Sequence, residues 1–577
     1  MRLPLGGLLL ILSLPPLLRA QDSVIVIDPD LPAGDSALVQ AGPAPDIVAE
    51  LLDFYNDSAT TRMEGDVSFP AGSEFAGRLA VLRGSLRLAG RVRGDVVVIN
   101  ATLYLLPGAD LVGDILVVGG RLIRSPEARH QGRERVVWDA APVDRSASGA
   151  LVVRERRRPL RELAQARTSF QTGRVRTTLL LTTGGTYNRI EGLPIVFGPT
   201  FELRPSRASV ARVDLRGILR TAGEGARLSS DFGYGARAEL RFPLWGLAGR
   251  LYSEVAPFEN QPLSSSENGW SAFLLQRDYR DYFERQGGGG AAWVQPTRTL
   301  RIEVSLRRDQ ERSLRATDPW SLLRNSDRWR RNPLSDDGHY FTTGLQVDLD
   351  TRNDRDAPST GWLLGARYEH STSDDVAPLA LPETVRPPTP TGGGYQFDRL
   401  TLDLRRYSRL TPNVRVNGRL RADGWIGGDR LPIQRRVSLG GPDLLPGYAF
   451  RSFTCAPRGF SDPSNPALCD RSITAQIEVR TRLGLNLGYR PRDRETGARG
   501  RLIGIEEADL VLLTDAGKAW LAGDGPGQVA VNRIPSLDEW KLDVGVGLDA
   551  GGIGAYLAKS LSEDEPVRFL VRLQRRF

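Results

Sequence analysis

Lysine, histidine, cysteine and long apolar runs are all scarce in this chain of 577 residues. Three of its 77 basic residues are lysines, Lys518, Lys541 and Lys559, and the sequence contains no compact basic stripe interleaved with aromatic residues. Such a stripe is the usual footprint of a nucleic-acid-binding surface. Both signs of charge occur throughout, so the net charge of +8 describes a polar surface. We therefore do not expect nucleic acid as a partner.

Apolar segments of about 18 residues, the length that a membrane-spanning helix needs, do not occur after the N-terminal leader. The leader itself, "MRLPLGGLLLILSLPPLLRAQ", has Arg2, an apolar core to Leu18, and Ala20 ahead of the polar Gln21. This order is typical of a secretory signal peptide, and the core is too short and too rich in proline to span a bilayer. We predict a signal peptide over 1–20 and export of the mature chain.

Cysteine occurs twice, at Cys455 and Cys469, on either side of a polar segment rich in proline. In an exported protein, such a pair most simply forms a disulfide, which contributes roughly 3 kcal/mol for a loop of about 15 residues. The alternative, a metal site, needs about four ligands, and no histidine is near in the sequence. We expect the disulfide, no metal and no other cofactor.

Three histidines, His130, His339 and His370, limit the options for acid–base catalysis. The last two fall at expected strand ends, where an exposed histidine is ordinary. The glycines at 287–290 lack the lysine and the serine or threonine of a phosphate-binding loop, and we interpret them as a hairpin turn. The segment "DLDTRNDRD" lacks the glycine and terminal glutamate of a calcium-binding loop. We expect no enzymatic activity.

A short repeat occupies the N-terminal region. Residues 21–61 are rich in proline, alanine and aspartate, which predicts a linker with one short helix. Within 62–135, similar blocks begin at Gly94, Gly113 and Gly132, 19 residues apart. Strand-like runs with glycine at the corners predict a short β-solenoid, with a β-meander as the alternative. The stretch resembles the bactofilin-like polymer-forming domain.

Alternation of apolar and charged residues dominates the rest of the chain. Residues 136–185 are interpreted as a basic connector, either a solvated helix or linker or a segment inserted into a barrel. From 186 to 577, segments such as "ARAELRF" place apolar and charged residues on opposite faces, and arginine and carboxylates recur on the polar face. This pattern predicts an all-β fold, a transmembrane antiparallel β-barrel of about sixteen strands. Eleven candidate strands, beginning near Ile195, precede the segment 438–450, and five follow it.

The final strand, "VRFLVRLQRRF", has apolar residues on one face and ends on Phe577. A terminal strand that finishes on phenylalanine resembles the C-terminal signal by which outer-membrane barrels are recognised for insertion. We assign Phe569 and Phe577 to this signal. It agrees with the predicted leader.

The segment "SLGGPDLLPGYAF", residues 438–450, lies in the long loop between the eleventh and twelfth candidate strands. It resembles the inward-folded loop of the BamA/TamA outer-membrane assembly family, the bacterial surface antigen barrels. That loop has a Gly-Gly pair followed by Val-Arg-Gly-Phe/Tyr. The corresponding residues here are Gly440, Gly441, Leu445, Pro446, Gly447 and Tyr448, with proline in the arginine position.

Neighbouring motifs extend the resemblance over roughly 193–577. "LLTDAGKAW" matches a family strand through Asp515 and Gly517, and two loop cysteines occur in some members. The resemblance implies an outer-membrane location, with the N-terminal region in the periplasm, contact with outer-membrane lipid, and unfolded outer-membrane or periplasmic proteins as partners. "LDTRNDRDAPSTGW" matches a strand-turn-strand pattern through Asp350, Arg352, Asp354, Pro358 and Gly361.

In the family, the loop arginine enters the lumen and pairs with carboxylates on facing strands. The matching acids are Glu478 and Asp515, and a buried carboxylate without a partner is strongly unfavourable. We predict that Arg451 supplies the missing guanidinium; the alternative is that lumenal water and other arginines solvate both acids.

The resemblance implies protein insertion or translocation through a lateral seam, although residues 21–171 do not resemble the polypeptide-transport-associated domains of that family. The alternative is a passive channel or scaffold whose solenoid binds a partner or self-associates.

Overall fold

The computed structural model contains the whole chain. Among the described residues, no helix combines the length and the apolar character needed to cross a membrane. The predicted signal peptide lies outside the described residues. These are residues 45–576 except 138–140, 142, 147–148, 154–164, 183–186, 207–208, 223–231, 259–262, 298, 325–327, 354–357, 377–378, 380–393, 412, 458–459, 461–465, 484–486, 490–502, 506–507, 526 and 551–552.

The N-terminal region folds as a parallel β-solenoid. Two parallel sheets, in the order β1-β4-β6-β8-β11 with β2 and β9, and β10-β7-β5-β3, wind along the chain. Val96 lies opposite Ile115 and Asp110 opposite Arg129, both 19 residues further on. This register confirms the solenoid and excludes a β-meander. The strands are β1 (Thr60–Glu64), β2 (Val67–Phe69), β3 (Glu74–Ala76), β4 (Arg78–Leu88), β5 (Arg91–Arg93), β6 (Val96–Leu105), β7 (Asp110–Val112), β8 (Ile115–Val118), β9 (Leu122–Arg124), β10 (Arg129–Gln131) and β11 (Glu134–Val137).

The Gly-Asp pair that opens the repeats at Gly94 and Gly113 has a structural cause. Gly113 has φ 149°, and a Cβ at this position would lie 2.3 Å from the carbonyl oxygen of Gly94 in the previous coil. The next residue, Asp114, accepts the backbone N–H of Arg133 one coil later at 2.9 Å. Hydrogen bonds from the side chain and backbone of Arg133 hold the pKa of Asp114 below its usual value. The repeat therefore stacks close backbones and links neighbouring coils.

One helix and one hairpin cover the outer face of the larger solenoid sheet. Helix α1 (Pro45–Asn56) lies where a short helix is predicted, and the hairpin consists of β12 (Val143–Arg145) and β13 (Leu151–Val153). Leu51 and Tyr55 of α1 are buried in one cluster with residues of the sheet and the hairpin. The solenoid thus has one apolar core inside the coils and a second beneath α1.

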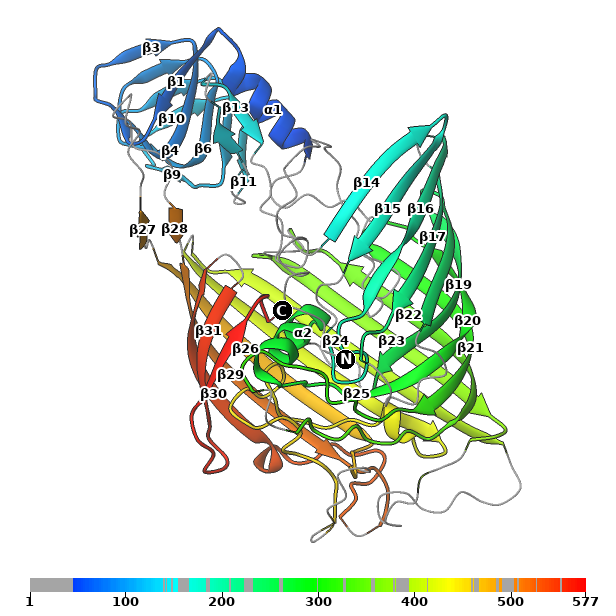
Figure 1. Cartoon of the computed structure of the whole chain (residues 1–577). Helices are drawn as coiled ribbons and strands as arrows, with labels where there is room; N and C mark the ends of the chain where they lie inside the picture. Colours follow the sequence, from blue (N-terminus) through cyan, green and yellow to red (C-terminus); the bar gives the residue numbers. More distant parts are fainter. Residues whose placement is uncertain are drawn as a thin grey trace. The chain divides into compact units, whose positions relative to one another are not determined.

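The C-terminal region contains one antiparallel sheet of 17 strands, joined in sequence order from β14 to β32. Figure 1 shows this sheet curving around α2 (Ser265–Leu275). The strands are β14 (Gln165–Thr172), β15 (Val175–Thr182), β16 (Ile195–Ser206), β17 (Ser209–Leu219), β18 (Phe232–Arg241), β19 (Trp245–Pro257), β20 (Tyr282–Val294), β21 (Leu300–Ser313), β22 (Gly338–Asp350), β23 (Gly361–Ser373), β24 (Tyr395–Arg409), β25 (Val414–Gly428), β26 (Arg471–Leu483), β29 (Ala508–Trp520), β30 (Lys541–Ala550), β31 (Ile553–Ser560) and β32 (Arg568–Arg572). A separate small hairpin consists of β27 (Leu487–Tyr489) and β28 (Ile503–Ile505).

Burial in this sheet is inverted relative to a water-soluble protein. In β30, Leu542, Val544, Val546 and Leu548 are 37 to 48% exposed, whereas Asp543 is fully buried. Apolar residues outside and charged residues inside are what a barrel in lipid requires. The structure confirms the predicted fold class: a β-solenoid followed by a transmembrane β-barrel of about sixteen strands.

Two details of the prediction need correction. The sheet begins at Gln165, inside the segment 136–185 that we interpreted as a connector, because β14 and β15 form a hairpin that turns at Gly173. The charged run at 154–158 obscured the alternation that follows it.

Residues 287–290 are also not a turn: they lie in the middle of β20. A Cβ at Gly289 would lie 3.0 Å from the Arg307 Cβ, so the missing side chains leave room for the long side chains of the neighbouring strands.

Candidate functional site: the lumenal loop and the C-terminal tail

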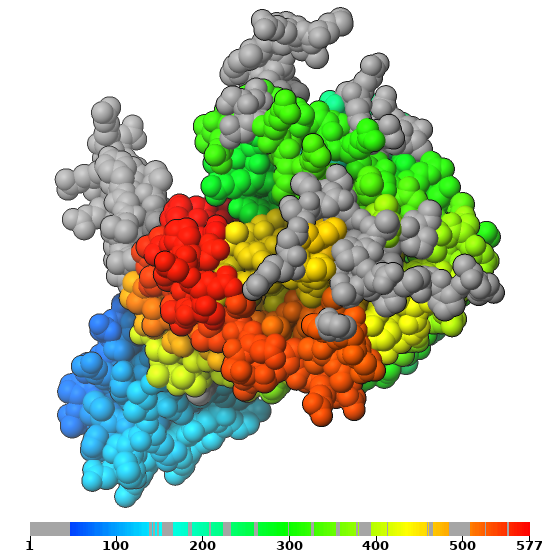
Figure 2. Space-filling view, turned by 90° about the horizontal axis from the view of Figure 1, so that it is seen from below, coloured from blue at the N-terminus to red at the C-terminus, as the bar shows by residue number. Residues whose placement is uncertain are grey.

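The connection between β25 and β26, residues 429–470, contains the Gly-Gly motif and folds against the inside of the sheet. Figure 2 shows it, in gold, between the red C-terminal strands and the green strands from the middle of the chain. Gly440 and Gly441 have φ 99° and 117°, a conformation that side chains disfavour. A Cβ at Gly440 would lie 2.3 Å from the Ala449 oxygen. The glycine pair is therefore needed for the tight turn that opens the motif.

The second half of the motif docks on β30 and β31. The Gly447 N–H donates to Asp543 Oδ2 at 2.6 Å, and the Tyr448 hydroxyl donates to the Leu542 oxygen at 2.9 Å. Tyr448 is 1% exposed and packs in one cluster with Leu445, which is fully buried. These contacts hold the loop inside the barrel, as the resemblance implies. Pro446, between them, has no cationic group to offer.

The two predicted acids are buried as expected. Glu478 in β26 is fully buried and Asp515 in β29 is 1% exposed. Asp515 also lies directly opposite Asp543 of β30, so two carboxylates face each other across the strand pair. Close carboxylates in an interior of low dielectric constant require cationic or N–H partners.

Arg451 is not that partner, so this prediction is wrong. Its guanidinium pairs with Asp281, at the end of the connection that carries α2. The chain has already turned away from β30 at Ser452, whose N–H bonds to the Ala449 oxygen, and Arg451 itself has φ 56°. Arg451 therefore fastens the outer part of the loop to a neighbouring loop.

Arg576, the penultimate residue of the chain, reaches both acids. Its Nη2 lies 2.5 Å from Asp515 Oδ2, and its Nη1 lies 3.6 Å from Glu478 Oε1. Arg480, two residues along β26, holds the other oxygen of Glu478 at 2.9 Å. The C-terminus thus supplies the guanidinium that the motif lacks. In the sequence, Arg576 falls on the same polar face of the expected final strand as Arg572, which was the one available signal. The alternation did not show that the chain leaves the strand before Arg576.

The last strand ends early, and the tail turns into the lumen. Arg572 donates to both oxygens of Glu267, at 2.9 and 3.2 Å, and to Asp443 Oδ1 at 2.9 Å. The N–H groups of Leu573 and Gln574 donate to Glu267 Oε1 at 2.8 and 3.1 Å. Glu267 sits in the first turn of α2, whose N-cap, Ser264, accepts the Glu267 N–H.

Phe569 remains in β32, opposite Leu557, and is 63% exposed on the outward face. Phe577 lies outside the described residues.

The barrel sequence matches a known domain. A family model described as the Omp85 superfamily domain matches residues 236–490, which include the Gly-Gly motif and both cysteines. This confirms the predicted relationship to barrels of the BamA/TamA type. The sequence match and the inverted burial of the sheet agree on an outer-membrane β-barrel.

Solved structures similar to this chain include outer-membrane barrels of low sequence identity. BamA from Haemophilus ducreyi lacking POTRA domains 1-3 is 11% identical, over 74% of this chain and 73% of that one, with a TM-score of 0.41. CdiB from Acinetobacter baumannii is 11% identical over 71% and 66%, with a TM-score of 0.31. CdiB from Escherichia coli is 10% identical over 70% and 63%, with a TM-score of 0.29. The chain thus spans about two thirds of the CdiB chains. No curated protein matches it.

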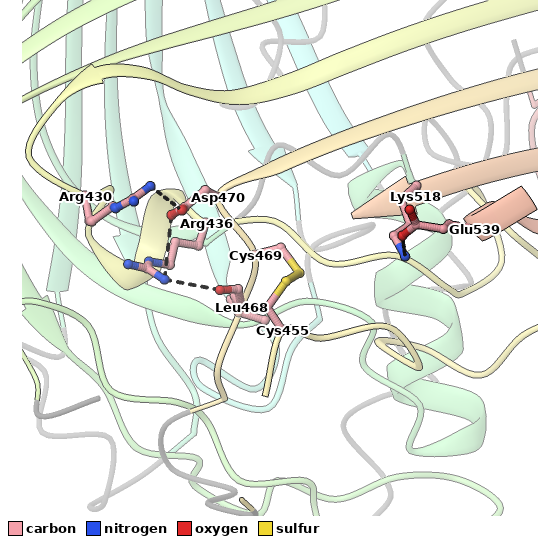
Figure 3. The surroundings of a disulfide bond; sticks show 8 residues. All are labelled: Arg430, Arg436, Cys455, Leu468, Cys469, Asp470, Lys518 and Glu539. Carbon is pink, nitrogen blue, oxygen red and sulfur yellow. Dashed lines mark hydrogen bonds and ion pairs between the residues drawn. A yellow bond between two sulfur atoms is a disulfide. The ribbon is translucent and has the colours of Figure 1, made fainter. Parts of the chain in front are cut away.

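The predicted disulfide is present in the Omp85 domain, at the stem of the inward loop. Cys455 and Cys469 are bonded, with their Cα atoms 5.1 Å apart. Next to Cys469, Asp470 lies between Arg430 at 2.9 Å and Arg436 at 3.7 Å (Figure 3). The bond and this ion cluster fix the position where the loop returns to β26.

Other matched residues support the same loop. A Cβ at Gly517 would lie 3.1 Å from the Leu439 side chain, so this glycine of the "LLTDAGKAW" strand lets the loop approach β29. Asp350 and Arg352 form an ion pair at 2.9 Å after β22. Asp354 lies outside the described residues.

The three histidines lie apart from one another, each beside one carboxylate. His130 in the solenoid contacts Glu134, whereas His339 and His370 contact acids in or beside β23 and β24. In the part of the chain that the structure describes, no group of three or more histidine, cysteine, aspartate or glutamate side chains is arranged to hold a metal.

Proposed function

We propose that this barrel inserts or translocates polypeptides through a lateral seam between the first and last strands of its sheet, without a cofactor and without catalysis. The observation that supports this best is that the strands at the two ends of the sheet are short and, in the described part of the chain, are not paired with each other. β14 and β15 have 8 residues each and β32 has 5, against 15 in β24 and β25. Among the described residues, no strand ladder joins β14 to β32.

A strand at such an edge presents backbone N–H and C=O groups that can pair with an incoming strand. β14 is poorly suited to be a permanent part of the barrel wall, because its residues 166–172 are all exposed. Its outward positions include Thr168 and Thr172 among Ala166 and Phe170, a less apolar set than in β30. An incoming strand of an unfolded outer-membrane or periplasmic protein would extend the sheet at this end, while the inward loop braces the lumen.

Depletion of the protein, followed by quantitative proteomics of outer membranes, tests the assembly function. We expect the abundance of several β-barrel proteins to fall, and no fall in any of them rejects assembly. Complementation then tests the seam. A double variant, Thr168→Cys with Val571→Cys, is expected to lose complementation only after a bifunctional thiol reagent bridges β14 and β32. The two single-cysteine variants are the matched controls.

A second candidate, a channel or scaffold whose solenoid self-associates or binds a partner, is supported by the two edge strands of the larger solenoid sheet, β1 and β11. Outer strands of a parallel stack have unpaired edges, so the end strands of two copies can pair. Next to β11, the Arg133 side chain is 84% exposed. Larger assemblies of the full chain in nanodiscs that Arg133→Glu disperses would favour the scaffold. Conductance in planar bilayers without any effect on other barrel proteins would favour the channel.

A further inference from the structure

Four buried carboxylates meet inside the barrel although they come from four different elements. Glu267 belongs to α2, Asp443 to the inward loop, Glu478 to β26 and Asp515 to β29, and none is more than 6% exposed. Two arginines bridge them in pairs: Arg572, the last residue of β32, joins the first two, and Arg576 of the tail joins the last two. A cluster this acidic is a ready binding site for guanidinium groups.

The tail occupies this cluster as a bound peptide would. Arg572 is the last residue of the β31–β32 ladder, opposite Gly554, and residues 573–576 beyond it are held by side chains and loops. Glu267 takes the Arg572 guanidinium with both of its oxygens and also accepts two backbone N–H groups of the tail. The loop contributes backbone oxygens: the Pro442 oxygen accepts from Arg572 and the Asp443 oxygen accepts from Arg576, at 3.3 and 3.2 Å.

The geometry points to a lumenal peptide-binding site whose ligand is a basic segment with two arginines four residues apart, and whose occupant in this structure is the chain's own C-terminus. This site goes beyond the proposed function and does not rest on it, because it requires neither a seam nor assembly activity. Lysine would be a poor substitute, since a single ammonium group cannot make the forked contact that Arg572 makes with Glu267.

A labelling experiment on the full chain in detergent micelles tests this site. Gln574→Cys places one reactive thiol in the tail, and among the described residues the two native cysteines are both in the disulfide. The rate of reaction with a charged maleimide reports release of the tail. We expect Arg576→Ala to raise the rate at least tenfold and Arg575→Ala, the matched control, to leave it nearly unchanged, because the Arg575 side chain is 21% exposed and lies 3.8 Å from its partner, Asp509.

A competing peptide then tests whether the site takes a ligand. The synthetic heptapeptide VRLQRRF is expected to raise the labelling rate of the Gln574→Cys chain saturably, whereas VKLQRKF at the same concentration has at least a tenfold weaker effect. Equal effects of both peptides would mean nonspecific cation binding and would overturn the proposal. No effect of either peptide, with faster labelling in Arg576→Ala, would make the tail a purely structural brace and would also overturn it. Because the peptide arm uses the unaltered lumen, it remains decisive if Arg576→Ala fails to fold.

Discussion

The ion cluster of Arg576, Asp515 and Glu478 joins the end of the chain to two strands of the barrel wall. All three side chains are buried, so each charge has lost most of its hydration. The arrangement persists because each carboxylate has a guanidinium partner. Removing one member leaves an unpaired buried charge, which is more unfavourable than removing the whole group.

We therefore expect Arg576→Ala to lower the free energy of unfolding by about 3–5 kcal/mol, the range for breaking a buried ion pair from one side. Arg575→Ala should lower it by less than about 1 kcal/mol, since its pairing is partly exposed. Urea titration in micelles, followed by the heat-modifiable migration of the barrel in gels, measures both. Adding Asp515→Asn to Arg576→Ala should recover part of the lost stability. Equal losses of stability in Arg576→Ala and Arg575→Ala would show that Arg576 has no special role.

The close packing of Gly447 against β30 and β31 gives a second prediction at the scale of one residue. A Cβ at this position would lie 2.7 Å from both the Asp543 Cβ and the Ser560 nitrogen, and backbone cannot move away cheaply. Gly447→Ala should therefore lift the motif from β30 and lower the free energy of unfolding by about 1–3 kcal/mol, as overpacking does. Limited proteolysis within 429–470 would detect the lifted loop. Gly418→Ala is the control, because the nearest atom to its Cβ is 4.0 Å away; a loop equally protected in both variants would contradict this account.

At the scale of elements, the inward loop is held at its stem, at its tip and along its side by three kinds of contact. The disulfide closes the stem, the motif docks on β30 and β31, and Arg451 pairs with Asp281 in the connection that carries α2. These contacts lie on different elements, so they act independently to first approximation.

Cys455→Ser with Cys469→Ser should accordingly lower the free energy of unfolding by roughly 3 kcal/mol while the tip stays docked. Protease sites between 455 and 469 are expected to become accessible, and sites at 440–448 to stay protected. Mass mapping of the cleavage products distinguishes the two regions. Cleavage throughout 429–470 would mean that the stem controls the whole loop.

At the scale of the whole molecule, the barrel keeps its charges inside and its apolar side chains outside. Ion pairs line the interior wall of strand after strand, as Arg399 with Asp423 and Arg419 with Asp403 illustrate. The outward positions of the same strands carry leucine, valine and isoleucine. This arrangement is stable only where the outer surface meets lipid.

Val546→Arg tests whether the outward face of β30 contacts lipid or water. When the barrel is folded in phospholipid vesicles, we expect this variant to lower the free energy of unfolding by about 2–4 kcal/mol, the range for an arginine on the lipid face at the bilayer midplane. Leu561→Arg, at an exposed loop position after β31, should change the free energy of unfolding by no more than about 0.5 kcal/mol. A neutral Val546→Arg variant in vesicles would place this face of the sheet outside the membrane.

The sequence alone determined the solenoid, the barrel and the disulfide, because each of them leaves a local pattern in the sequence. The 19-residue step with Gly113 and Gly132 predicted stacked coils, the alternation in segments such as 236–242 predicted a barrel, and the cysteine pair predicted the disulfide. The tertiary structure alone decided which charges meet. Asp515 and its partner are separated by 61 positions, and Glu267 and Arg572 by 305. No local period encodes such contacts: they exist because β32 stops at Arg572 and the tail turns inward, where the proline of the motif has left two buried acids to be neutralised.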